Sequence, residues 1–144
     1  MKWFVLLAGL AVAGCSASAT ATPPNTAPPP PVGYREAVVA EVKNTFFDPY
    51  SVRDAEISQP LYATALFDGS NIVPKQSWIV CIKANAKNRM GGYTGRELVV
   101  MSIAGNKVTS ALSGRDMQMQ LAAHCKEAVW EPFPEIEMTA ATPA

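Results

Sequence analysis

The first periodic pattern of apolar residues lies between residues 34 and 46. Apolar side chains recur there at every fourth position, which gives one apolar stripe on a helix. The positions of this stripe are Tyr34, Val38, Val42 and Phe46. Asp48 then precedes Pro49, and a residue before proline is disfavoured in the α region. The pattern predicts a helix over residues 34–46 that ends before the Asp48-Pro49 pair.

Two shorter patterns follow, separated by Pro60. Pro49–Ser51 reads as a turn, Val52–Gln59 is weakly strand-like, and Leu61–Phe67 alternates apolar and polar residues more cleanly. Because proline cannot donate a hydrogen bond to a ladder, we expect either one bent edge strand or a strand followed by a loop. Asp68–Asn71 is rich in turn-forming residues and predicts the next turn.

The most strand-like segments are Trp78–Ala84 and Leu98–Ile103, which are rich in aromatic and β-branched residues. Gly105-Asn106 comes soon after the second segment and predicts a two-residue hairpin into a strand at Lys107–Ala111. A final helix is predicted over Asp116–Cys125, where apolar residues again recur with a helical period.

These elements predict an α+β domain over residues 34–136. We expect a small antiparallel sheet of three or four strands, with the N-terminal and C-terminal helices packed on one face. Trp130 and Phe133, which lie among prolines, are expected to close the domain as a flap. No internal repeat is visible.

Composition narrows the functional classes. The 144-residue chain holds 12 acidic and 12 basic residues, and this balance argues against a dedicated nucleic-acid binder, which usually carries a basic face. Many of the prolines lie between Pro23 and Pro31. Residues 16–33 contain only small, uncharged or proline residues, so they predict an extended tether rather than a folded element. A docking ligand for a proline-recognising partner is the alternative. Residues 137–144 are predicted to be a disordered tail.

Residues 1–14 have the proportions of a signal peptide, because Lys2 precedes an apolar run too short to span a bilayer. The run ends in Val12-Ala13-Gly14-Cys15, which resembles the lipobox of bacterial lipoproteins. The resemblance implies cleavage before Cys15, lipidation of that cysteine, and anchoring of residues 15–33 to a membrane by acyl chains. Ser16 after the cysteine would imply the outer membrane, with the domain in the periplasm or at the surface. An ordinary signal peptide with a chance cysteine, or a buried apolar segment, are the alternatives.

If Cys15 is lipidated, two cysteines remain to form a disulfide, Cys81 and Cys125. An even number of cysteines in an oxidising envelope compartment predicts one structural disulfide. Two free thiols, or a redox or metal site with the neighbouring His124, are the alternatives. The chain has one histidine and no CxxC pair, so we predict no metal and no cofactor.

The polar segment between the two strongest strands, residues 85–95, is the best candidate for recognition. Its asparagines and glycines suit a hairpin connection whose side chains satisfy their own backbone. Alternatively, two cations and an aromatic ring could contact an anionic or glycan partner. The candidate recognition residues are Asn85, Lys87, Asn88, Arg89, Gly91, Gly92, Tyr93 and Gly95.

Two segments resemble a group of small uncharacterised bacterial envelope proteins. One is Asp48-Pro49-x-Ser51-Val52, and the other is the run from Val80-Cys81 through Asn85-Ala86-Lys87-Asn88 to Gly91-Gly92-Tyr93-x-Gly95. The shared patterns are DPxSV and VCxxxNAKNxxGGYxG. The resemblance implies a place in the envelope and no particular activity.

No catalytic constellation is evident. Ser51, Ser77 and Thr94 have no motif that links them to His124. Asp54 and Glu56 alternate on one strand, where two carboxylates more often form a solvated edge than an acid–base pair. The sequence therefore predicts a lipid-anchored envelope protein with a non-catalytic binding or structural role, whose partner is an envelope protein or a cell-wall glycan. The alternatives are an inhibitor-type module that acts on a cell-wall hydrolase, and an enzyme of unknown reaction.

Overall fold

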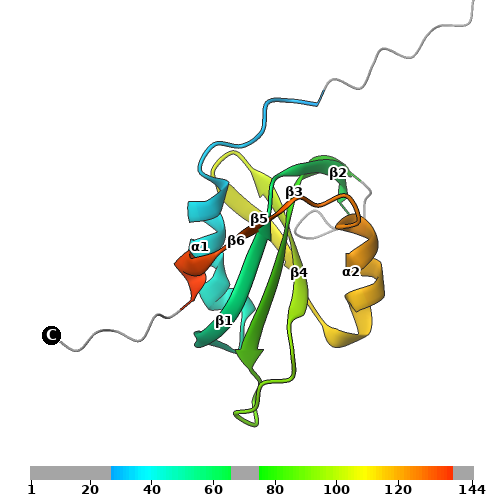
Figure 1. Ribbon diagram of the computed structural model, residues 1–144. Helices are drawn as coiled ribbons and strands as arrows, with labels where there is room; N and C mark the ends of the chain where they lie inside the picture. The colour runs from blue at the N-terminus through cyan, green and yellow to red at the C-terminus, as the bar shows by residue number, and fades with distance from the viewer. Residues whose placement is uncertain (1–26, 66–74, 138–144) are drawn as a thin grey trace, which may run out of the picture.

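The computed structural model describes residues 27–65 and 75–137. These residues form an α+β domain with an open antiparallel sheet of six strands and two α-helices (Figure 1). The elements are α1 (Tyr34–Thr45), β1 (Asp48–Ser58), β2 (Leu61–Ala65), β3 (Lys75–Lys87), β4 (Glu97–Ala104), β5 (Lys107–Leu112), the 3₁₀ helix η1 (Arg115–Met117), α2 (Gln118–His124), β6 (Trp130–Pro132) and the 3₁₀ helix η2 (Pro134–Ile136).

The sheet has the order β5-β4-β3-β1-β6, and β2 also pairs with β3. β3 is its centre, because it pairs with three other strands. The predicted hairpin at Gly105-Asn106 is confirmed, since Ala104 pairs with Lys107 and Gly105 adopts a φ of 60°.

β1 and β2 pair with the same edge of β3, one after the other. Ile57 pairs with Ile82 and Leu61 pairs with Ile79, so residues 58–60 lie opposite residues 80–81. The ladder is interrupted there, and the Oγ of the buried Ser58 accepts a hydrogen bond from the N–H of Cys81 at 2.9 Å. A side-chain hydroxyl thus takes the place of a backbone carbonyl beside Pro60.

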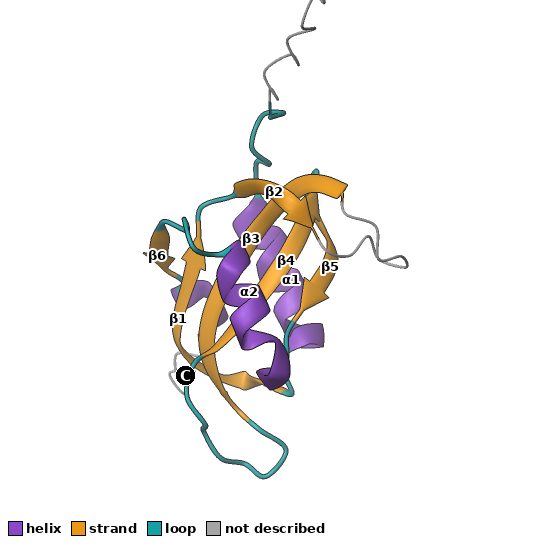
Figure 2. Ribbon diagram, turned by 90° about the vertical axis from the view of Figure 1, so that its right-hand side faces the viewer, coloured by secondary structure: helices purple, strands orange, loops and turns teal. Residues whose placement is uncertain are grey.

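The expectation that both helices pack on one face is wrong, because α1 and α2 lie on opposite faces of the sheet (Figure 2). Alternate residues of a strand point to opposite faces. Accordingly, Val80 and Ile82 of β3 pack in the cluster that includes α1, whereas Ile79 and Cys81 pack in the cluster that includes α2.

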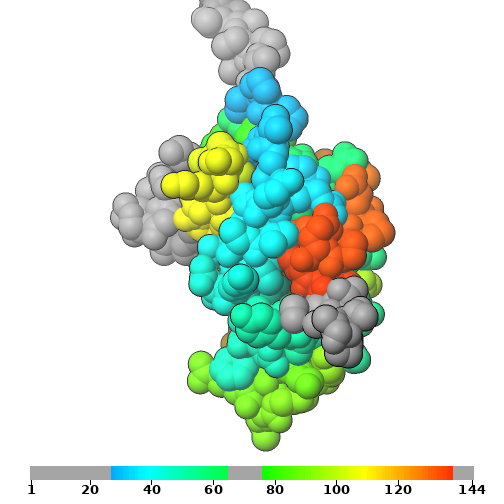
Figure 3. All heavy atoms as spheres, turned by 90° about the vertical axis from the view of Figure 1, so that its left-hand side faces the viewer, coloured from blue at the N-terminus to red at the C-terminus, as the bar shows by residue number. Residues whose placement is uncertain are grey.

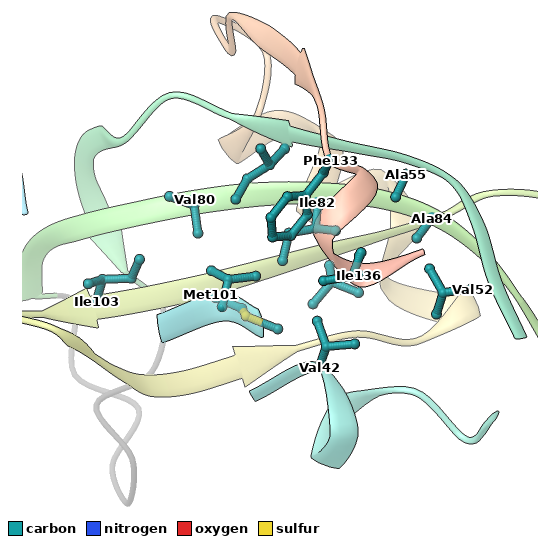
Figure 4. Close-up of a cluster of buried hydrophobic side chains, with 13 residues drawn as sticks. Val42, Val52, Ala55, Val80, Ile82, Ala84, Met101, Ile103, Phe133 and Ile136 are labelled. Atoms are coloured by element: carbon teal, nitrogen blue, oxygen red, sulfur yellow. The ribbon is translucent and has the colours of Figure 1, made fainter. Parts of the chain in front are cut away.

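The α1 face holds the larger core. The 3₁₀ helix η2 and the residue before it close this core (Figure 4). Phe133 is fully buried there, and Ile136 is buried beside it. Arg35 of α1 holds this segment from outside, with bonds of 2.8 and 2.9 Å to the carboxylate of Glu135 and 3.0 Å to the carbonyl of Pro132. The predicted closing flap is therefore divided between the faces: Phe133 closes the α1 face, whereas Trp130 of β6 packs against the cluster that includes α2.

The α2 face holds a smaller core, which contains a disulfide bond between Cys81 and Cys125. The bond links the central strand to the residue after α2. Gln118 ties the other end of α2 to β4, because its side-chain amide accepts from Leu98 N–H at 2.8 Å and donates to the Leu98 carbonyl at 3.1 Å.

The number of strands and the start of β1 also differ from the prediction. The strands number six rather than three or four, because β1 and β2 are separate strands and β6 adds a short one. Pro49–Ser51 is not a turn: β1 begins at Asp48, directly after α1. Nor is β1 an edge strand, since β6 pairs with its last three residues.

Several predictions fall outside the described residues. They are the signal peptide, the lipidation of Cys15, most of the tether, the turn at Asp68–Asn71 and nearly all of the C-terminal tail. Within residues 27–65 and 75–137, no helix is both long and apolar enough to cross a membrane.

Candidate functional site

The connection between β3 and β4 spans residues 88–96 and is braced by one side chain. The Oδ1 atom of Asn88 accepts hydrogen bonds from the N–H groups of Met90 at 2.9 Å and of Gly92 at 3.1 Å. The N–H of Asn88 also donates to the carbonyl of Gly92 at 3.0 Å, and Gly91 adopts a φ of 76°. The asparagine and glycines therefore have a structural role in a tight hairpin connection.

The predicted recognition segment is divided between a strand and this loop. Asn85 and Lys87 belong to β3, whereas Arg89, Tyr93 and Gly95 lie in the connection. Asn85 is only 8% exposed, and its Oδ1 has no hydrogen-bond partner among the described residues. Asn85 is therefore a buried strand residue rather than an exposed recognition residue.

The two segments that carry the family resemblance contact each other. The Oγ of Ser51 donates to the carbonyl of Asp48 at 2.8 Å and accepts from the N–H of Lys87 at 2.8 Å. The hydroxyl of Tyr93 donates to the carbonyl of Ser51 at 2.9 Å. The start of β1 and the β3–β4 connection are thus one structural unit, and Ser51 joins them.

Tyr93 is also flanked by cations. The guanidinium carbon of Arg53 lies 3.6 Å from the centroid of the Tyr93 ring, and the Nζ of Lys87 lies 5.7 Å from it. Arg53 precedes Asp54, which adopts a positive φ of 53° where the pairing of β1 with β3 is irregular. A bulge of this kind re-aims a side chain, and here it accompanies the stacking of Arg53 on the ring.

Large apolar side chains are exposed at the same end of the sheet. Phe47 is 64% exposed, Tyr50 66% and Met90 93%. The guanidinium carbon of Arg89 lies 5.6 Å from the centroid of the Phe47 ring. We call the surface formed by Phe47, Tyr50, Arg53 and residues 87–93 the loop-end surface. It combines aromatic rings with cations, as recognition surfaces often do.

Two cations of the loop-end surface are available to a partner. Neither Lys87 nor Arg89 forms an ion pair with a carboxylate among the described residues, although Asp48 pairs with Lys87 in the ladder. Other cations nearby do have carboxylate partners. These pairs are Arg53 with Asp54 at 3.6 Å and Arg96 with Glu56 at 2.9 Å. The carboxylates of Asp54 and Glu56 therefore serve as ion-pair partners in the structure.

A cavity of about 230 Å³ lies beside these cations, on the α1 face. It is bordered by the end of α1, by β3 and β4, and by the connection between them. Its apolar lining includes Phe46, Ala84, Ala86 and Val99. Its polar lining comprises Thr45, Lys87, Asn88, Arg89, Thr94, Glu97 and Ser113.

The structure brings together no catalytic group that the sequence analysis considered. Ser51 bonds to backbone groups, and Thr94 accepts a hydrogen bond from Arg115 at 3.0 Å. His124 borders a different cavity, of about 490 Å³, with Tyr62 of β2. Within the described ranges, no three His, Cys, Asp or Glu residues are grouped as metal ligands.

Comparisons of the chain with protein-family models, with curated proteins and with solved structures found no match.

Sequence reasoning missed three residues of this surface. Phe47, Tyr50 and Arg53 come from the start of β1 and from the residues before it, about forty positions away from the loop. The DPxSV pattern was the available signal, because it lies among them. Its spatial contact with the second pattern could not be inferred from a single sequence.

Proposed function

We propose that this domain is a non-catalytic binding module of a lipid-anchored envelope protein, and that the loop-end surface contacts its partner. One observation carries the proposal: Lys87 at the end of β3 and Arg89 on the braced loop lie among exposed aromatic side chains, and neither has a carboxylate partner among the described residues. Bracing lowers the entropy lost when a loop binds. The partner that fits has a negatively charged surface, as a cell-wall glycan or an acidic envelope protein would have.

The orientation of the domain supports this proposal. The tether joins α1 at its first turn, and the loop-end surface lies beyond the last turn of the same helix (Figure 3). α1 has 12 residues, and at about 1.5 Å per residue it separates the two ends by roughly 18 Å. If Cys15 carries the lipid anchor, the tether enters the domain at the end opposite the binding surface, and we propose that the anchored membrane is the outer membrane.

The test is sedimentation of the full-length protein with isolated bacterial cell wall and, separately, binding to dextran sulfate with neutral dextran as reference. The variant Lys87→Ala/Arg89→Ala removes the two cations of the loop-end surface that have no carboxylate partner among the described residues. Lys107→Ala/Lys126→Ala removes the same charge from exposed positions elsewhere. We expect at least a tenfold loss of affinity in the first variant only, and weaker binding of the native protein at high salt because exposed charges are screened. Equal binding by the two variants would refute the proposal.

The exposed tip of the loop favours a second candidate function. Met90 is 93% exposed at a turn whose backbone Asn88 braces, and a protruding apolar side chain on a braced backbone suits insertion into the cleft of another protein. An inhibitor-type module acting on a cell-wall hydrolase would use the loop in this way. Met90→Ala should then abolish inhibition of purified hydrolases, whereas sedimentation with cell wall should be little changed.

The anchor is tested separately, by intact mass of protein extracted from membranes. We expect a chain that begins at Cys15 and carries acyl groups. Reduction should add two hydrogen atoms, because one disulfide is present in the domain. A chain without acyl mass would refute the anchor and leave the binding proposal to its own test.

A further inference from the structure

The connection between β3 and β4 projects beyond the rest of the domain, at the end opposite to the segment that enters α1 (Figures 1 and 2). Met90 lies in the turn of this connection and is 93% exposed. Gly91 and Gly92 follow it and carry no side chains. The end of the domain therefore presents an apolar side chain on a backbone that Asn88 braces.

One face of this protruding loop carries cations around a tyrosine ring. The guanidinium carbon of Arg53 lies 3.6 Å from the centroid of the Tyr93 ring, and the Nζ of Lys87 lies 5.7 Å from it. This is the α2 face, because Ala84 and Ala86 pack toward α1 and Lys87 alternates with them along β3.

The opposite face carries a second pair of a cation and an aromatic ring. Phe47 follows α1 and is 64% exposed, and the guanidinium carbon of Arg89 lies 5.6 Å from the centroid of its ring. Both residues border the cavity on the α1 face. Met90 thus has a cation and an aromatic ring on either side of it.

The sign of the charges changes with distance from Met90. Residues 85–96 contain three basic residues and no acidic residue. The acidic residues around this segment belong to the neighbouring strands, namely Asp48 and Asp54 in β1 and Glu97 in β4. Asp54 and Glu97 each have an arginine nearby, at 3.6 and 3.7 Å. The order from the tip inward is therefore apolar, then basic, then acidic.

A lipid surface fits this order better than a polymer chain does. A glycan strand or an extended peptide lies along one face of the loop, so it would contact one of the two cation–aromatic pairs and leave Met90 in water. An anionic bilayer surrounds an inserted tip, so both pairs reach the headgroups at once. Aromatic rings and basic side chains are favoured at the headgroup level, and apolar side chains below it.

We infer that the loop-end surface inserts into an anionic phospholipid bilayer. The side chain of Met90 enters the apolar boundary of the acyl chains, and the rings of Phe47 and Tyr50 lie at the headgroup level. Lys87 and Arg89 lie beside the lipid phosphates, where basic residues are attracted to anionic lipids. The inference rests on the proposed binding function and names a membrane as the negatively charged partner of the same surface.

The experiment captures a second set of vesicles. Full-length protein is reconstituted into phosphatidylcholine vesicles that carry a biotinylated lipid and are held on streptavidin beads. Fluorescent vesicles of phosphatidylcholine, or of an equimolar mixture with phosphatidylglycerol, are then added. We expect the beads to retain only the anionic vesicles, and less of them at high salt because exposed charges are screened. Protein that the first vesicles do not hold is tested directly, by sedimentation with each vesicle type.

Two methionine variants separate insertion from charge. Met90→Ser removes the apolar side chain and keeps every cation, whereas Met119→Ser makes the same change on α2, where Met119 is 86% exposed. Only Met90→Ser should lower capture of the anionic vesicles, by about tenfold. Binding to dextran sulfate should be the same for both variants, because that probe has no apolar interior. Both side chains are exposed, so both variants should melt like the native protein.

The outcomes distinguish this inference from the proposed function. Equal retention of neutral and anionic vesicles, or capture that Met90→Ser leaves unchanged, overturns the inference. If no vesicles are retained but dextran sulfate still binds through Lys87 and Arg89, the inference falls and the proposed function stands, with a glycan as the partner. If neither vesicles nor dextran sulfate bind, both are overturned.

Discussion

The two faces of the central strand are stabilised by different means. On the α1 face, 13 buried residues pack together, and they come from α1, from the three strands β1, β3 and β4, and from η2 with the residue before it. On the α2 face the buried cluster has six residues, two of which are the cysteines of the disulfide. The comparison teaches that a covalent bond stabilises the face that has less apolar surface to bury.

The helices themselves explain the difference. α1 has 12 residues and packs against both β1 and β5, whereas α2 has seven residues and packs mainly against β4. A helix of seven residues is far shorter than the roughly 12–15 residues at which isolated helices become marginally stable. α2 therefore depends on its attachments, which are the disulfide at one end and Gln118 at the other.

The largest expected effect is on the α1 face. Phe133→Ala removes a fully buried ring and should lower the free energy of unfolding by about 3–5 kcal/mol. Urea unfolding measures this loss. Val129→Ala is the control, because Val129 is exposed and its truncation should change stability by less than about 0.5 kcal/mol. A small effect of Phe133→Ala would mean that the α1 face does not depend on its apolar core.

The corresponding change on the α2 face is removal of the disulfide. The bond joins residues 44 positions apart, and a loop of this length is worth on the order of 4 kcal/mol in the chain-entropy model. Cys81→Ala/Cys125→Ala should therefore be strongly destabilised in urea, and reducing agent should have no further effect on it. Cys15→Ser leaves the pair intact and should melt like the native domain. If the double variant were as stable as the native protein, the contrast between the faces would fail.

A smaller loss is expected at the junction of β1 and β2. Ser58→Ala leaves the buried N–H of Cys81 without its acceptor, which should cost about 1–3 kcal/mol. Ser77→Ala serves as the control, because its hydroxyl makes only a long bond of 3.5 Å. Equal urea midpoints for the two variants would show that water replaces the missing acceptor.

The smallest effect concerns the ion pair outside the α1 core. Burial alone would lower the pKa of Arg35 and raise that of Glu135. A hydrogen bond from the backbone N–H of Glu135 lowers the pKa of its carboxyl group, and the hydrogen bond and attraction between the two side chains lower it further and raise the pKa of Arg35. Because the pKa of Glu135 is lowered from its ordinary value of 4.5, the pair stabilises the fold above that pH and is lost as pH falls through the lowered value. The Glu135 side chain is 43% exposed, so solvent screening limits Glu135→Gln to a loss of less than about 1 kcal/mol at neutral pH.

This loss of stability should disappear in strong acid, where the Glu135 carboxyl of the unsubstituted protein is protonated in the folded and in the unfolded state. Urea unfolding at neutral pH and again well below the ordinary pKa of Glu135 measures the difference. Glu36→Gln is the control, since Glu36 lies in the same helical turn as Arg35 but forms no ion pair among the described residues. A Glu135→Gln effect that is independent of pH would mean that the contact acts by packing and not by charge.

Much of the fold could be predicted from sequence. The spacing of Val38 and Val42 identified α1, and Gly105-Asn106 identified a hairpin, because both patterns report local geometry. The disulfide followed from counting cysteines, and the structure contains it. The opposite placement of the helices was missed, although the unbroken apolar run Ile79–Ile82 is typical of a strand buried on both faces.

The candidate site was predictable only in part. The sequence identifies Lys87, Arg89 and Tyr93 as candidate recognition residues, because two cations and an aromatic ring lie close together in it. Arg53 is not identified, since its contact with Tyr93 depends on an irregular pairing of β1 with β3 that no local pattern encodes. The prediction that Asn85 is a recognition residue is wrong, because Asn85 lies in β3 and is buried there.

The hydroxyl of Ser58 also has a consequence for strand alignment. A shift of β1 by one residue against β3 would carry Ile57 from the core to the opposite face. The same shift would move Ser58 away from the N–H of Cys81, because only one hydroxyl is available at that point of the ladder. Correct alignment is therefore specified twice, once by an apolar side chain and once by a polar one, and misaligned pairings lose both contacts together.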